Sequence, residues 1–120
     1  VMKENSFFNI TERSCRHCGW YVEQEDFLER LTQARILADI PFRINSWCRC
    51  PFYDKQVKGE GNHTTGRGVD IGYDTPQERA KIVFALIKAG FERIGIDFKR
   101  NFIHADMVED KPSPAIWIYT

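Results

Sequence analysis

The stretch Thr75-Pro-Gln-Glu-Arg-Ala-Lys-Ile-Val-Phe-Ala-Leu-Ile-Lys-Ala-Gly90 carries the clearest structural signals of the sequence. Thr75 is suited to cap a helix, Pro76 is favourable at the first helical position, and Glu78 completes a Thr-x-x-Glu capping box. Gly90 is the expected left-handed residue at the end of the helix. The sequence therefore predicts a helix within residues 75–90. Four apolar residues are expected to form its buried stripe: Ala80, Val83, Phe84 and Ile87.

The segments on either side of this helix predict the rest of the fold. A second helical pattern runs from Glu23 to Ala38, and Pro41 ends it. Its expected buried residues are Phe27, Leu28, Leu31, Ala34 and Ala38. Residues 50–68 are rich in Pro, Gly, Asp and Asn and lack a period, which predicts a long loop. Short strands are predicted near residues 42–47, 69–73, 93–96, 102–107 and 115–119, the last three as a meander. We therefore expect an α+β fold with helices packed on one face of a small, mainly antiparallel sheet.

Composition narrows the class of protein. A length of 120 residues suits one domain, so we expect a single domain over residues 1–120, with an irregular segment at 1–20. Because 17 basic residues balance 17 acidic ones, the chain lacks the positive field of a nucleic-acid binder. It also lacks an apolar run of the roughly 20 residues that a membrane span needs. The first five residues do not resemble a signal peptide, so we expect synthesis in the cytoplasm. We also expect a monomer.

Two histidines lie near carboxylates at suggestive spacings. His63 precedes Asp70 in the predicted loop and strand, and His104 and Asp106 share one face of a later strand. If these strands are neighbours, His63, Asp70 and His104 can converge. Two imidazoles and one carboxylate would form a three-ligand zinc site with an open fourth position, which is the catalytic arrangement. The alternative is that these polar groups are simply solvated.

Three motifs, in order, resemble those of the zinc D-alanyl-D-alanine peptidases. Residues 61–70 (Gly-Asn-His-Thr-Thr-Gly-Arg-Gly-Val-Asp) resemble the family's Ser-x-His-x-x-Gly-x-Ala-x-Asp motif. Residues 90–95 (Gly-Phe-Glu-Arg-Ile-Gly) and 101–106 (Asn-Phe-Ile-His-Ala-Asp) resemble its second motif. Residues 41–51 (Pro-Phe-Arg-Ile-Asn-Ser-Trp-Cys-Arg-Cys-Pro) are similar to its Ile-x-Ser-Gly-Tyr-Arg-Cys-Pro segment. The family includes phage endolysins and VanY-like carboxypeptidases, with the hedgehog signalling domain as a distant relative, so the resemblance implies a hedgehog/peptidase-like fold.

The resemblance implies a role for each matching residue. It assigns three zinc ligands: His63, Asp70 and His104. Arg49 matches the arginine that binds a substrate carboxylate or steadies the oxyanion; the alternative is a surface salt bridge. Asn101 stands where some members carry the acidic catalytic base, and asparagine cannot accept a proton. We expect Asp106 to be the base, and weigh equally the alternative that it orients a ligand histidine.

The four cysteines form two close pairs: Cys15 with Cys18, and Cys48 with Cys50. One interpretation is a second, structural zinc site with four thiolates, or with three thiolates and His17. The others are ordinary buried thiols, or disulfides formed after release from the reducing cytoplasm. The sequence favours the latter two, and hence one zinc ion per chain.

Aromatic residues near these motifs are candidates for a substrate groove. Tyr53 and Trp47 flank Arg49 in sequence, and by resemblance Trp117 could lie near the zinc ion. The alternative for Trp117 is packing in the core or at the sheet edge, because Trp117 alternates with Ile116 and Ile118 along the last predicted strand.

The resemblance implies a zinc peptidase that hydrolyses peptidoglycan stem or cross-bridge peptides next to a D-amino acid. It would act on the cell wall after release from the cytoplasm, as phage endolysins do, or be carried in a virion. Carboxypeptidase, endopeptidase and L-alanyl-D-glutamate cleavage remain open. The alternative is an inactive, zinc-stabilised binding or virion structural protein of the same fold.

Overall fold

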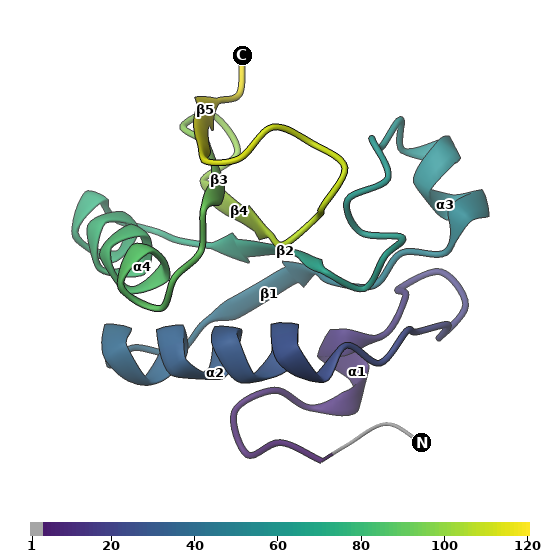
Figure 1. Cartoon of the computed structure of the whole chain (residues 1–120), viewed down its shortest axis with the longest axis horizontal. Coiled ribbons are helices and arrows are strands. Elements are labelled where there is room, and N and C mark those ends of the chain that lie inside the picture. Colours follow the sequence, from purple (N-terminus) through teal and green to yellow (C-terminus); the bar gives the residue numbers. More distant parts are fainter. Residues whose placement is uncertain (1–3) are drawn as a thin grey trace.

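In residues 4–120, which the computed structural model describes, five strands form one sheet that is accompanied by four helices (Figure 1). The helices are α1 (Ile10–Arg13), α2 (Glu25–Ala38), α3 (Pro51–Gln56) and α4 (Pro76–Lys88). The strands are β1 (Arg43–Ser46), β2 (Gly68–Gly72), β3 (Arg93–Asp97), β4 (Phe102–Asp106) and β5 (Ala115–Ile118). The expected α+β class is confirmed.

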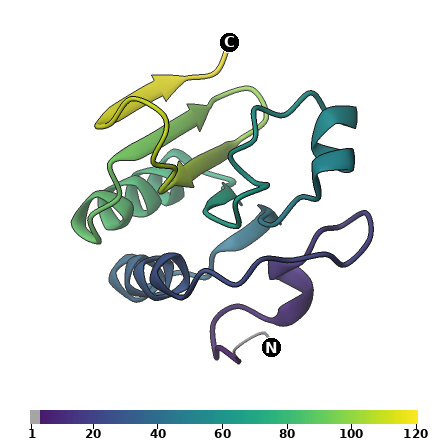
Figure 2. The same cartoon turned by 45° about the vertical axis from the view of Figure 1, so that its right-hand side comes forward.

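The sheet is mixed, which corrects the expectation of a mainly antiparallel sheet. Its strand order is β1-β2-β4-β3-β5; the first three pairs are antiparallel, and β3 pairs with β5 in parallel. The last three strands are therefore no meander. After β4 the chain passes to the far side of β3, and β5 forms the edge of the sheet there (Figure 2). A connection of this kind leaves β5 parallel to β3 and adjacent to it.

Helices α2 and α4 pack against each other and cover one face of the sheet (Figure 1). The five apolar residues predicted for the buried face of α2 are all buried. They meet alternate residues of the central strands, including Val69, Ile71, Ile103 and Ala105, each of which is fully buried. Because side chains alternate along a strand, the residues between these point to the opposite face of the sheet.

Helix α4 begins and ends as predicted but turns a different stripe to the core. The Thr75 hydroxyl accepts a hydrogen bond from the backbone N–H of Glu78 at 3.1 Å, and Gly90 is left-handed with φ +98°. Phe84 and Ile87, however, are 68% and 49% exposed. The buried residues of the helix are Ile82, Ala85 and Leu86. The helix carries two overlapping apolar stripes of the same period. Its contacts with α2 and β4 bury the stripe formed by Ile82, Ala85 and Leu86.

Two short helices lie in segments that were predicted to be irregular. In α1, Asn9 and Glu12 form a reciprocal capping box. In α3, Pro51 follows Cys50, whose sulfur accepts a hydrogen bond from the backbone N–H of Tyr53. These helices are too short to show an apolar period, and a cysteine is an unusual cap, so periodicity could not reveal them.

The turn between β3 and β4 depends on one buried carboxylate. Asp97 accepts hydrogen bonds from the backbone N–H groups of Lys99 (2.9 Å) and Arg100 (2.7 Å), and its side chain is 2% exposed. Burial alone would raise the pKa of Asp97, but these two N–H groups and the Arg100 guanidinium lower it overall. The ionised carboxylate therefore stabilises the folded state.

We expect Asp97→Ala to lower the free energy of unfolding by about 1–3 kcal/mol, because two turn N–H groups lose their acceptor. Since the folded-state pKa lies below the ordinary value of 3.8, this stabilisation is present above that pH and is lost as the pH falls below it. Urea titrations at pH 7 and pH 3 measure both effects. Asp74→Ala is the control: its exposed pair with Arg43 should contribute less than about 1 kcal/mol. An equal loss in both variants would contradict this role for Asp97.

Candidate functional site

One row of paired residues runs across four strands on the face opposite α2 and α4. Asp70 of β2 pairs with His104 of β4, His104 with Gly95 of β3, and Gly95 with Trp117 of β5. A side chain at Gly95 could not fit, since its Cβ would lie 2.5 Å from the Trp117 indole nitrogen and 2.7 Å from the Tyr119 ring. Gly95 therefore lets both aromatic rings lie across the sheet toward His104.

The three predicted metal ligands converge at one end of this row. His104 Nδ1 lies 2.9 Å from Asp70 Oδ1, and His63 Nε2 lies 3.4 Å from Asp70 Oδ2. One ligand atom from each of these residues can be chosen so that all lie within 4.8 Å of one another. Both histidines are buried, and Asp70 is partly buried. The loop before β2 thus brings His63 to the Asp70–His104 pair.

The far nitrogen of each imidazole is held by a hydrogen-bond acceptor. His63 Nδ1 lies 2.8 Å from the Trp47 carbonyl oxygen, and His104 Nε2 lies 2.6 Å from Asp106 Oδ2. A carbonyl and a carboxylate can only accept, so these nitrogens carry the hydrogens. His63 Nε2 and His104 Nδ1 are thereby directed at Asp70. Held imidazoles beside a carboxylate form a donor set that fits a zinc ion.

The charges of the cluster are consistent with a cation site. Burial raises the pKa of Asp70, but hydrogen bonds from His104 and His63 lower it well below its usual range, so this carboxylate is ionised. Burial lowers the pKa of His104, but Asp106 and Asp70 raise it overall. In the metal-free protein, the Nδ1 proton of His104 occupies the position that a bound cation would take.

Asp106 is enclosed on every side. Its side chain is fully buried, and Oδ1 accepts hydrogen bonds from Arg93 Nε at 2.7 Å and from the Val108 backbone N–H at 3.2 Å. Its other oxygen contacts His104 on the side of the ring away from Asp70. Of the two roles weighed for Asp106, this geometry favours orienting the ligand histidine.

A cavity of about 360 Å³ lies beside the cluster. Its lining includes the two histidines and Asp70, together with three cationic residues: Arg49, Lys58 and Arg100. Arg49 donates to Asp54 at 2.9 Å and to the Ser46 hydroxyl at 3.1 Å, and its guanidinium lies 4.0 Å from Asp70. Arg49 is thus both paired and part of the cavity. The cavity is suited to an anionic group next to the metal-ligand cluster.

The cavity also contains residues that sequence reasoning missed. Glu60, Arg100 and Tyr119 line it. Burial, with the negative charges of Asp70 and Glu60 nearby, raises the pKa of Tyr119 to about 12, so its hydroxyl remains a hydrogen-bond donor. The sequence places Tyr119 only at the end of the strand predicted near residues 115–119, because the parallel pairing of β5 that brings it to the site is not visible in the sequence.

The predicted aromatic candidates have different locations. The Trp117 ring lies 5.8 Å from the His104 ring and 4.9 Å from the Arg93 guanidinium. Trp47 is buried in the core, where its ring contacts Phe8 and Phe27, while its carbonyl holds His63. Tyr53 stacks on His17, at 5.2 Å between ring centroids and nearly parallel, and is not part of the cavity lining. Trp117 therefore stays a candidate, whereas Tyr53 belongs to another cluster.

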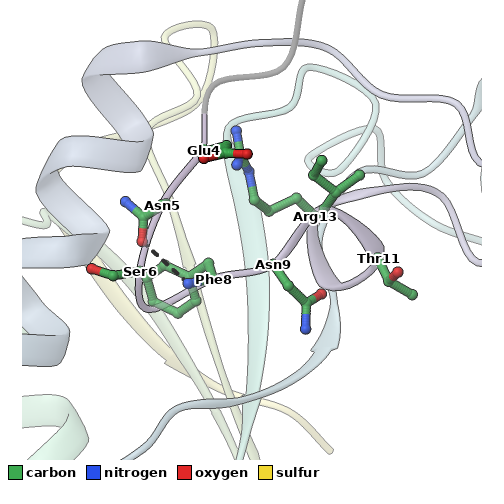
Figure 3. A pocket seen from close by; sticks show the side chains of 8 residues that line it. Glu4, Asn5, Ser6, Phe8, Asn9, Thr11 and Arg13 are labelled. Atoms are coloured by element: carbon green, nitrogen blue, oxygen red, sulfur yellow. Dashed lines mark hydrogen bonds between the residues drawn. The ribbon is translucent and has the colours of Figure 1, made fainter.

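A larger cavity, about 600 Å³, lies elsewhere, along residues 4–13 (Figure 3). Its lining holds none of the histidines or cysteines, and Arg13 within it is paired with Glu23 at 3.1 Å. Volume alone does not identify a functional site, so we assign the site to the smaller cavity, where ligating and cationic groups converge.

Three of the four cysteines form a second cluster. The sulfurs of Cys15, Cys18 and Cys50 lie within 4.8 Å of one another. Cys48 lies outside it, with its sulfur 3.8 Å from the Val22 carbonyl oxygen. All four are free thiols. A four-thiolate site therefore does not form, while a three-thiolate group does.

Comparison with models of protein families, with curated proteins and with solved structures finds no match for this chain. Within residues 4–120, none of the helices combines the length and apolar character that crossing a membrane requires.

Proposed function

We propose that the chain is a zinc peptidase that cleaves peptidoglycan peptides next to a D-amino acid. The observation that carries the proposal is the convergence of His63, Asp70 and His104, with both imidazoles held from behind, at a cavity that contains cationic side chains. These are also the residues that match the family's ligand motifs. A bound zinc ion would supply Lewis acidity at a peptide carbonyl and lower the pKa of water to about 7.

The residues around the cavity suit this reaction. Arg49, with Lys58 and Arg100 nearby, would bind a carboxylate of the stem peptide and so fix the position of the scissile bond. The protonated Tyr119 hydroxyl would donate a hydrogen bond to the oxygen that gains negative charge during attack. Each role uses a side chain that lines the same cavity as the metal ligands.

Glu60 is our choice for the catalytic base. The reaction needs a group that takes a proton from water and returns it to the leaving amine. In the part of the chain that the structure describes, the cavity lining contains two carboxylates, Asp70 and Glu60. Asp70 is committed to the two histidines, whereas Glu60 is exposed. Asp106 would instead keep His104 in its ligating orientation.

We expect Asp106→Asn to weaken zinc binding about 10- to 100-fold, because the carboxylate that orients His104 and accepts from Nε2 is lost. Competition with a chromophoric chelator measures this affinity, and turnover is then compared at saturating zinc. Asp110→Asn, at an exposed position nearby, is the control and should bind zinc normally. Unchanged zinc affinity with lost turnover would instead identify Asp106 as the base.

Incubation with purified muropeptides, followed by mass spectrometry, tests the function and identifies the bond. The proposal predicts one new cleavage product whose formation stops with a chelator and resumes when zinc is added. Absence of cleavage across stem peptides and cross-linked dimers, in protein shown to contain zinc, would overturn it.

One observation favours a second candidate, a zinc-stabilised binding protein without activity. Asn101 replaces the expected acidic residue and sits in the β3–β4 turn with φ +57°, a left-handed conformation that asparagine tolerates well. Its carbonyl oxygen accepts from the Tyr73 N–H at 3.0 Å. Asn101 thus has a structural role in this turn. Because asparagine cannot accept a proton, catalysis would depend on Glu60. Tight muropeptide binding without cleavage would select this candidate.

A further inference from the structure

The cysteine cluster joins two separate segments of the chain. Cys15 and Cys18 lie in the loop after α1, and Cys50 lies directly before α3. Figure 1 shows this loop lying close to the start of α3. The three sulfurs fall within 4.8 Å of one another, and His17 Nδ1 lies 4.0 Å from the Cys50 sulfur. Tetrahedral zinc with Zn–S bonds near 2.3 Å places sulfurs about 3.8 Å apart, so the cluster is close to that geometry.

The surrounding backbone stabilises thiolates. The Cys50 N–H donates to the Cys15 sulfur, and the Tyr53 N–H donates to the Cys50 sulfur, each at 3.4 Å. Gly19, with φ +81°, closes the turn that carries Cys15 and Cys18, since its N–H bonds to the Cys15 carbonyl at 2.8 Å. A thiolate is the form that binds a metal.

The other interpretations of these cysteines fit less well. Cys18 is exposed, so it is not a packed apolar residue of the core. Three clustered sulfurs cannot all be satisfied by one disulfide, because one thiol would remain unpaired. His17 stacks on Tyr53 and lies near Phe52, which holds its imidazole at the edge of the cluster. An odd number of thiols with an adjacent imidazole is typical of a Cys₃His structural site.

We propose that Cys15, Cys18, Cys50 and His17 bind a second, structural zinc ion. This ion would tie the loop after α1 to the start of α3. Asp54, in α3, pairs with Arg49 at the edge of the cavity, so the same ion would help to hold that side of the cavity in place. The proposal does not depend on the peptidase function, because it uses a different set of ligands.

Cobalt substitution tests the site by a signal specific to sulfur ligands. The reduced protein (residues 1–120) is loaded with Co²⁺ and its absorption spectrum is recorded. Thiolate ligands give an intense charge-transfer band in the near ultraviolet, which a site with two imidazoles and one carboxylate does not produce. Four-coordinate cobalt adds visible bands at either site. The charge-transfer band is expected, and zinc should displace it; its absence from cobalt-loaded protein would overturn the proposal.

Four variants separate this site from the candidate catalytic one. Cys18→Ser should weaken the charge-transfer band, whose intensity follows the number of cobalt–sulfur bonds, while the matched control Cys48→Ser should keep it in full, because Cys48 lies outside the cluster. His104→Ala should also keep it. His17→Ala should keep the band but alter the visible spectrum; an unchanged visible spectrum would remove His17 from the ligand set. A weaker band in Cys48→Ser, or an undiminished band in Cys18→Ser, would overturn the assignment of the cysteines.

Discussion

Replacing His104 with alanine is expected to abolish muropeptide hydrolysis and to release the zinc ion from the candidate catalytic site. His104 is the central residue of that site: its Nδ1 faces Asp70, and its Nε2 is held by Asp106. Its loss removes one of three ligands and leaves two buried or partly buried carboxylates without their shared partner. Metal analysis and muropeptide digestion measure the two outcomes in the same preparation.

The third histidine offers a matched control for this experiment. His17 lies beside Cys50 and not in the cavity, so His17→Ala should keep the zinc ion of the candidate catalytic site, which His104→Ala loses. Circular dichroism shows whether His104→Ala still folds, and His63→Ala provides a second way to remove a ligand. Full hydrolysis by a folded His104→Ala protein that has lost the ion of the candidate catalytic site would end the zinc peptidase proposal.

A second large effect is expected for Glu60→Gln. If Glu60 accepts the proton from water, the amide should lower kcat by about 10²- to 10⁴-fold, the usual contribution of a general base. Zinc content should remain that of the unchanged protein, because Glu60 is outside the cluster formed by His63, Asp70 and His104. Rates with a defined stem peptide at saturating concentration, alongside metal analysis, separate these quantities.

Glu29→Gln is the control for Glu60, since Glu29 is exposed on α2 and lies outside the cavity lining. Its rate should match that of the unchanged protein. A normal rate in Glu60→Gln would exclude Glu60 as the base, and the Asp106→Asn result would then decide between Asp106 and a protein without activity.

Local patterns were sufficient to predict that His63, Asp70 and His104 converge, because backbone periodicity controls where they lie. Alternation along β4 places His104 and Asp106 on one face, and the spacing from His63 to Asp70 suits a loop that leads into a strand. The pairing of β2 with β4 then brings Asp70 opposite His104. The helix within residues 75–90 is likewise predictable from the sequence, because its Thr75 cap depends on Glu78, only three residues further along the chain.

The remaining features depend on contacts between distant segments. The burial of Asp106 against Arg93 requires the register of β3 with β4, and the place of Tyr119 requires β5 to pair in parallel with β3. The exposure of Phe84 depends on where α4 meets its neighbours. The grouping of Cys50 with Cys15, and not with Cys48, likewise follows from how α3 lies on the loop after α1. None of these is encoded in a short window of sequence.

The row from Asp70 through His104 and Gly95 to Trp117 has a consequence for folding. In β4, polar His104 alternates with the core residues Ile103 and Ala105. A slip of β4 by one residue would turn His104 and Asp106 into the layer beneath α2 and α4, and would expose the apolar residues. Such an arrangement would bury charges without partners, at a cost of several kcal/mol. The polar residues of the site thus help to select the register of β4. Correct pairing of the strand therefore also assembles the site.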